Sequence, residues 1–247
     1  MVDAGERPGE DKEMAFFRVV NFAEQIPAIE GEGVFLRAPT MGDYEEWAVL
    51  REDSRVFLTP WEPTWPADDL TRGAYRRRLR RYAEDQRADQ AYPFFIFRKS
   101  DQALVGGLTL ANVRRGVAQA GTLGYWMGAP FARHGYMGAA VRSFLPHAFS
   151  LLRLHRIEAA CIPTNVPSVR LLQKNGFNHE GYAREYLCIN GVWQDHLLFA
   201  RLRDGALSPS TPAKASPLTQ PKTQPMTSSV SMPFLRPHDP ENSGSQP

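Results

Sequence analysis

The stretch that decides the fold spans residues 123–141 and reads LGYWMGAPFARHGYMGAAV. An apolar run enters a short loop that contains Pro130 and Gly135, and an alanine-rich helix follows. The free N–H groups at such a helix start, with the positive end of the helix dipole, favour an anion such as a pyrophosphate. Gly135 allows close approach of the backbone, and Arg133 and His134 add cationic contacts. Purely structural strand–helix junctions show the same pattern, so this stretch alone leaves both interpretations open.

A second stretch, residues 162–177, reads IPTNVPSVRLLQKNGF. Its Asn-x-x-Ser, the helix that follows and the closing Gly-Phe resemble the second cofactor signature of the GNAT N-acetyltransferases. The resemblance implies the GNAT fold, an α/β (α+β) architecture with a mixed central sheet of about seven strands and flanking helices. It also implies acetyl-CoA as co-substrate and no metal. The implied cofactor contacts are Tyr125, Trp126, Met127, Arg133, His134, Gly135, Tyr136, Met137, Gly138, Asn165 and Ser168.

Shorter segments extend the resemblance, over about residues 33–204, to the ribosomal-protein-alanine N-acetyltransferases within that family. They are FLTPWEP (57–63), LGY (123–125), GYM (135–137), HRI (155–157), EGYA (180–183), YL (186–187), NG (190–191) and WQDH (193–196). This closer resemblance implies a cytoplasmic enzyme whose acceptor is the N-terminal α-amine of a ribosomal protein such as S5. A small-molecule amine acceptor remains an alternative, as does a non-catalytic CoA-binding factor associated with ribosomes.

Three positions depart from the family pattern. The phosphate loop usually begins with Gln or Arg, and here Ala132 takes that position; the last small residue of the loop is replaced by Met137. Because backbone N–H groups do most of the phosphate binding, neither change should abolish it. Many relatives carry a tyrosine as general acid where this chain has Leu172, so the proton donor must come from elsewhere.

The family reaction is direct attack of a neutral amine on the thioester, which requires a base and a donor for the leaving thiolate. We nominate Glu185 as the base and Glu62 as its rival, although a glutamate is more often a solvated surface residue. Ser168 is the candidate to hydrogen-bond the leaving sulfur, and it suits a helix start equally well. Asp195 and His196 suggest a dyad, but adjacent residues of a strand point to opposite faces.

Arginines crowd the predicted helix at 69–87, whose apolar residues Leu70, Ala74, Leu79 and Tyr82 should face the core. Such a run is usually a solvated face, but it can also contact an acidic peptide or ribosomal RNA. The arginines are Arg72, Arg76, Arg77, Arg78, Arg80 and Arg81.

The amino-acid composition limits the classes of protein to which the chain can belong. The chain has 247 residues, and 29 Lys and Arg balance 27 Asp and Glu, so no global charge marks a nucleic-acid binder. Cys161 and Cys188 lie far apart, and we expect both to be reduced core residues. The acidic N-terminus does not resemble a secretory signal, and no apolar run reaches the ~20 residues that span a membrane, which predicts a cytosolic protein.

The expected organisation is a partly flexible extension at 1–32, a catalytic domain at 33–205 and a disordered tail rich in Pro, Ser and Thr at 206–247. Apolar periodicity predicts strands at 34–37, 94–98, 104–111, 122–127, 156–162, 182–189 and 193–201. It predicts helices at 41–51, 69–87, 136–151 and 166–175. Asn190-Gly191 predicts a type I′ turn between the last two strands.

Overall fold

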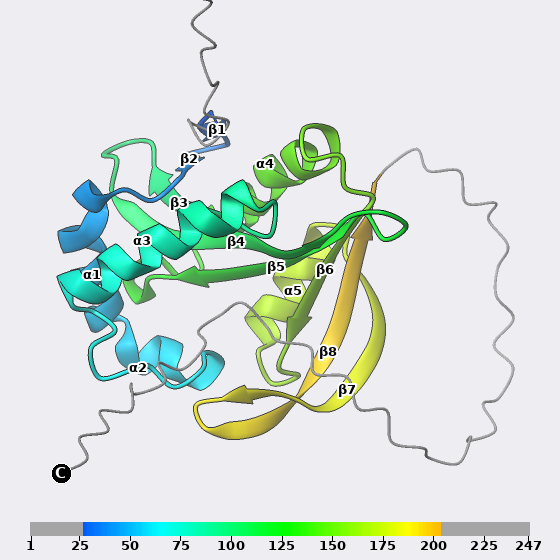
Figure 1. Ribbon diagram of the computed structural model, residues 1–247. Helices are drawn as coiled ribbons and strands as arrows, with labels where there is room; N and C mark the ends of the chain where they lie inside the picture. Colours follow the sequence, from blue (N-terminus) through cyan, green and yellow to red (C-terminus); the bar gives the residue numbers. More distant parts are fainter. Residues whose placement is uncertain (1–26, 204–247) are drawn as a thin grey trace, which may run out of the picture.

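The computed structural model describes residues 27–203, and the predicted tail at 206–247 lies outside them, as does most of the predicted extension. Eight strands form one sheet in the order β1-β2-β3-β4-β5-β6-β8-β7 (Figure 1), one more than the sequence indicates. Among the strand pairs within residues 27–203, only β5–β6 is parallel. The strands are β1 (Ile29–Glu30), β2 (Val34–Arg37), β3 (Tyr92–Arg98), β4 (Leu104–Arg114), β5 (Ala120–Met127), β6 (Arg156–Cys161), β7 (Asn178–Ile189) and β8 (Val192–Leu202).

Helices cover both faces of this sheet. The α-helices are α1 (Tyr44–Asp53), α2 (Arg55–Leu58), α3 (Arg72–Arg87), α4 (Tyr136–Ser150) and α5 (Val166–Lys174). Short 3-10 helices are η1 (Met41–Asp43), η2 (Thr59–Trp61) and η3 (Ala129–Phe131). The four long predicted helices are confirmed, whereas α2, η2, η3 and the two-residue β1 are too short to produce a periodic pattern.

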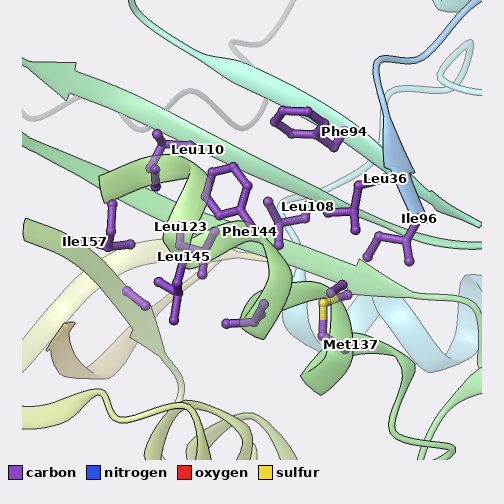
Figure 2. Close-up of a cluster of buried hydrophobic side chains, with 14 of the residues drawn as sticks. Leu36, Phe94, Ile96, Leu108, Leu110, Leu123, Met137, Phe144, Leu145 and Ile157 are labelled. Carbon is purple, nitrogen blue, oxygen red and sulfur yellow. The ribbon is translucent and has the colours of Figure 1, made fainter. Parts of the chain in front are cut away.

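The core is divided by the sheet into two clusters. Strand β3 is buried on both sides, and its residues alternate between the clusters. Phe94 and Ile96 join the larger cluster beneath α4 and α5 (Figure 2), while Phe95 and Phe97 pack with Trp47 beneath α1 and α3. This double burial is why β3 appears in the sequence as a continuous apolar run.

Capping residues determine where the helices begin. Thr40 precedes η1, and Asp43 accepts hydrogen bonds from the Thr40 N–H at 2.6 Å and from its hydroxyl at 3.0 Å. Helix α3 begins three residues later than predicted because Thr71 caps it by accepting from the Ala74 N–H. The core residue of α3 is the fully buried Tyr75, which the predicted apolar set omitted.

The last two strands form a long hairpin. Asn190 and Gly191 both have positive φ, 46° and 80°, which confirms the predicted turn. Both cysteines are free thiols, but only Cys161 is buried; Cys188 is exposed because it lies on the edge strand β7 near the hairpin tip. Within the described part of the chain, no helix has the length and apolarity needed to cross a membrane.

Candidate active site

The site centres on the divergence of β5 and β6, which Figure 1 shows clearly. The two strands pair only where Ala120–Thr122 faces Arg156–Glu158. Strand β5 continues to Met127 and stays paired with β4, while β6 continues to Cys161 and stays paired with β8. Backbone groups of residues 123–127 on the β6 side therefore have no strand partner. Such an edge is suited to pairing with the amides of an extended ligand.

The loop after β5 and the start of α4 form a candidate anion site. Gly135 is the N-cap, with φ of 86° and no side-chain cap, and its carbonyl accepts the helical bond from the Ala139 N–H. The N–H groups of Tyr136, Met137 and Gly138 precede that first bond and point out of the helix end. A Cβ added at Gly135 would meet no atom within 4 Å, so the space beside this backbone is open.

The side chains around this loop divide into two groups. Arg133 and His134 are exposed, and the His134 ring stacks on Tyr136 with centroids 6.0 Å apart. Met137 instead points into the larger core cluster (Figure 2), so its side chain does not line the loop. Trp126 likewise packs away from the loop, edge-on to Phe95 in the second cluster.

A polar pair joins β5 to the first turn of α5. The Tyr125 hydroxyl lies 2.7 Å from the Ser168 Oγ, and the Asn165 side chain caps α5 by accepting from the Ser168 N–H at 3.2 Å. Burial raises the pKa of the Tyr125 phenol, against a smaller opposing effect of the Ser168 hydrogen bond, so the phenol stays protonated. Burial also raises the pKa of the Cys161 thiol, which the neighbouring Ser168 hydroxyl partly offsets.

The 59–66 loop is fastened to the rest of the molecule through Glu62. Both Glu62 carboxylate oxygens accept from the Arg51 guanidinium, at 2.7 and 2.6 Å, and the Trp65 indole donates to the second at 2.7 Å. The guanidinium also lies over the Trp65 and Trp126 rings, 4.1 and 5.0 Å from their centroids. The Glu62 carbonyl accepts from the Asn190 N–H at 2.9 Å, which joins this loop to the tip of the β7–β8 hairpin.

Glu185 lies in an irregular part of that hairpin. The β7–β8 register shifts between Ala183 and Leu187, and Glu185 adopts a φ of 46° with an exposed side chain. Its N–H donates to Asp195 at 2.8 Å, and the Tyr182 hydroxyl donates to the same carboxylate. A non-glycine residue held in this conformation carries backbone strain, as do seven other described non-glycine residues with positive φ.

Asp195 and His196 do not form a dyad. Asp195 is bonded to Tyr182 and Glu185, whereas His196 is buried, with its Nδ1 2.9 Å from the Gln194 carbonyl. Burial lowers the pKa of His196, so its imidazole is neutral near pH 7. Sequence reasoning missed the role of Asp195 in holding the irregular strand, because that role depends on a register shift.

Leu172 is fully buried in the larger cluster. The position that carries a general acid in many relatives is therefore part of the core here. The Tyr125–Ser168 pair is a candidate source of a proton, and these two residues, 43 positions apart, leave no local pattern that predicts their contact.

The arginines of α3 fall into two sets. Arg72, Arg77 and Arg78 form ion pairs with Glu45, Asp68 and Asp69 respectively. The others, Arg76, Arg80, Arg81 and Arg87, have no ion-pair partner among the described residues. Arg76 and Arg80 are exposed and lie one helical turn apart. Between residues 27 and 203 there is also no group of three or more His, Cys, Asp or Glu side chains arranged to hold a metal.

Comparisons with known proteins agree with this geometry. A family model described as acetyltransferase (GNAT) domain matches residues 34–178. The probable N-acetyltransferase YjcK of Bacillus subtilis is 37% identical over 174 residues, 70% of this chain and 96% of YjcK. The [ribosomal protein uS5]-alanine N-acetyltransferase of Escherichia coli is 34% identical over 160 residues, 64% of this chain and 82% of that enzyme.

Among solved structures, Mycobacterium smegmatis RimJ in complex with CoA-disulfide has a TM-score of 0.67 and 32% identity, covering 71% of this chain and 86% of RimJ. The open edge of β5 and the uncapped, glycine-opened start of α4 fit a coenzyme A molecule. The chain belongs to the GNAT family of acetyltransferases and is an acyltransferase that uses acetyl-CoA.

Proposed function

We propose that this enzyme acetylates the N-terminal α-amine of a ribosomal protein, with an S5-like N-terminal alanine as the acceptor, in the cytoplasm. The similarity to the E. coli uS5-alanine enzyme supports this acceptor. The structural observation that carries the proposal is the Tyr125–Ser168 pair at the divergence of β5 and β6. It provides a half-buried hydroxyl donor where the leaving thiol of acetyl-CoA would emerge.

The proposed cofactor contacts follow the open edge and the loop. Residues 125–127 offer backbone groups to the pantetheine, and the N–H groups of residues 135–138 receive the pyrophosphate with Arg133 and His134 beside them. Asn165 organises the start of α5 through its cap, which holds Ser168 in place. Ser168 then donates its hydroxyl proton toward the leaving sulfur while accepting a hydrogen bond from Tyr125.

Glu185 is the proposed general base, and Glu62 is the rival. The Glu62 carboxylate already accepts hydrogen bonds from Arg51 and Trp65, which supports a role in anchoring its loop. The Glu185 side chain is exposed and is carried by a strained backbone that Asp195 holds in place. An α-amine acceptor needs little deprotonation by a general base, because roughly a quarter of it is already neutral at pH 7.4 if its pKa is about 7.7–8.0.

For the ribosomal partner, we propose that Arg76 and Arg80 contact RNA phosphates close to the acceptor protein. These two side chains are exposed and are not neutralised by ion pairs within residues 27–203. Reversing the charge of both arginines should weaken binding to ribosomal particles and should make that binding less dependent on salt concentration. Reversal of Arg77, which is paired with Asp68, should have a smaller effect.

The acceptor can be tested by incubating the enzyme with acetyl-CoA and peptides that differ only in their first residue, beside a panel of small amines. Preference for an N-terminal alanine peptide is the expected result. Faster turnover of a free small amine would show that the acceptor is a small molecule and not a ribosomal protein. Release of free thiol with no acetylated product in any reaction would instead favour a CoA-binding factor without transferase activity toward these acceptors.

A further inference from the structure

A serine at the junction of α1 and α2 serves a distant loop and not its own helix. Ser54 ends α1 and is the N-cap residue of α2, and it is fully buried. A serine at an N-cap normally accepts a hydrogen bond from an N–H group in the first turn of the helix that it precedes. The Ser54 hydroxyl makes no such bond with α2 and instead accepts from the Ala129 N–H, 75 residues away, at 2.8 Å.

This hydrogen bond reaches the loop that leads into the candidate anion site. Ala129 is the first residue of η3, which lies between the end of β5 and Gly135. Directly before it, Gly128 packs so closely on α1 that an added Cβ would lie 2.4 Å from the Leu50 side chain. One polar and one apolar contact, at neighbouring positions of the loop, therefore hold it against the end of α1.

The same turn of α1 also holds the 59–66 loop. Arg51 precedes Ser54 by three residues, a spacing that makes them neighbours on the helix surface. The Arg51 guanidinium donates to both carboxylate oxygens of Glu62 and lies over the Trp65 ring. One helical turn thus contacts both the loop before the candidate anion site and the loop beside the proposed acceptor site. Direct acetyl transfer depends on such spacing, because the amine and the thioester must be aligned to react.

We propose that Ser54 is a positioning residue for acetyl transfer, which acts through Ala129 to hold the candidate anion site at a fixed spacing from the 59–66 loop. The inference rests on the proposed contact between the pyrophosphate and the N–H groups of residues 135–138. Loss of the Ser54 hydroxyl leaves the Ala129 N–H without this acceptor. The loop can then shift, and the N–H groups at the start of α4 meet the pyrophosphate in a less favourable position.

The test compares Ser54→Ala with Tyr75→Phe in the full-length chain. Tyr75 is also fully buried, and its hydroxyl donates to the Thr40 carbonyl at 2.9 Å, so each substitution removes one buried hydroxyl and one hydrogen bond. Denaturant unfolding measures the stability of each variant, and calorimetry measures its affinity for coenzyme A. We expect both variants to lose stability, but only Ser54→Ala should bind coenzyme A more weakly, by about 2–12-fold, the effect of one hydrogen bond.

Gly128→Ala tests the same junction without removing a hydrogen bond, and it serves if Ser54→Ala does not fold. Gly128 has an ordinary φ of −60°, so alanine strains no backbone, but its Cβ would collide with Leu50 and displace the loop. Coenzyme A should again bind more weakly. With saturating acetyl-CoA and any acceptor that the enzyme uses, both variants should also show a lower kcat, whereas Tyr75→Phe should not.

Normal affinity for coenzyme A in folded Ser54→Ala and Gly128→Ala would overturn this inference, and so would an equal loss of affinity in Tyr75→Phe. A companion measurement on Gly135→Val separates the two proposals. If Gly135→Val binds coenzyme A weakly while Ser54→Ala binds it normally, only the role of Ser54 is wrong. If both bind it normally, the proposed cofactor contacts are wrong as well. The binding experiment uses no acceptor, so a failure to acetylate alanine peptides would remove the proposed acceptor and leave this result standing.

Discussion

The proposed cofactor end and the proposed acceptor end of this molecule are built in different ways. The cofactor end consists of two continuous segments, β5 with the start of α4 and β6 with the start of α5, and it uses mainly backbone groups. The acceptor end joins the 59–66 loop to a hairpin more than 120 residues later, through the Asn190 N–H and the Glu62 carbonyl. It depends on side chains, among them Arg51 and Trp65.

This difference predicts which changes each end tolerates. A backbone site is insensitive to most side-chain substitutions and is disrupted where a glycine conformation is required. A side-chain site is sensitive to the loss of any one partner, because the other partner is left unpaired. Substitutions at the acceptor end should therefore alter acceptor kinetics and leave cofactor affinity unchanged, and the reverse should hold at the cofactor end.

The largest effect should come from Glu185→Gln with a lysine-like acceptor. About one lysine in a thousand is neutral at pH 7.4, compared with roughly a quarter of α-amines, so loss of a base harms the more basic acceptor most. We expect a loss of ~10²–10⁴-fold in kcat/KM for the lysine-like acceptor and a smaller loss for the α-amine. Steady-state kinetics with paired peptides between pH 7 and 9 would measure it, and higher pH should partly restore the rate.

Glu62→Gln is the matched control for that substitution. If Glu185→Gln is as active as the unmodified enzyme at every pH while Glu62→Gln is inactive, the base is Glu62. The Glu62 carboxylate would then both anchor the 59–66 loop and act as the general base.

Gly135→Val should weaken acetyl-CoA binding by about 100-fold, since the β-branched side chain opposes the positive φ and fills the space beside the helix start. Gly116→Val is the control, because Gly116 also has a positive φ, 63°, and also has open space around its Cβ. Both variants should lose about 1–3 kcal/mol of folding stability, but only Gly135→Val should lose affinity in calorimetry. Normal affinity in Gly135→Val would show that the phosphate loop lies elsewhere.

Arg51→Met should destabilise the acceptor end by about 2–3 kcal/mol. Breaking a fully buried ion pair costs ~3–5 kcal/mol, and the loss should be smaller here because the Glu62 side chain keeps 18% of its surface exposed. The acceptor KM should rise while the acetyl-CoA affinity of the folded protein stays the same. Arg55→Met breaks an exposed pair with Glu52 and should cost at most about 1 kcal/mol. Denaturant unfolding and acceptor titrations would measure both, and equal losses in the two variants would contradict the anchoring role of Arg51.

The contrast between local backbone segments and side-chain contacts of distant residues also explains which features could be predicted from the sequence. The long strands, the four long helices and the Asn190-Gly191 turn leave local patterns, and all are confirmed. Pairings that join distant positions leave no such pattern. The Tyr125–Ser168 contact, the Arg51–Glu62 pair and the strained Glu185 all depend on how separate elements come together.

Tyr125→Phe should have the smallest effect, because it removes one neutral hydrogen bond of about 0.5–1.5 kcal/mol and so lowers kcat by roughly 2–12-fold. Cofactor affinity should change little, since the ring still packs against the core. The pH profile gives the sharper test. Because burial raises the pKa of Tyr125, the phenol should remain protonated through the ordinary tyrosine value of about 10, and the ratio of the two rates should stay constant up to that pH. A ratio that falls toward one between pH 8 and 10 would mean that Tyr125 ionises normally and does not assist Ser168.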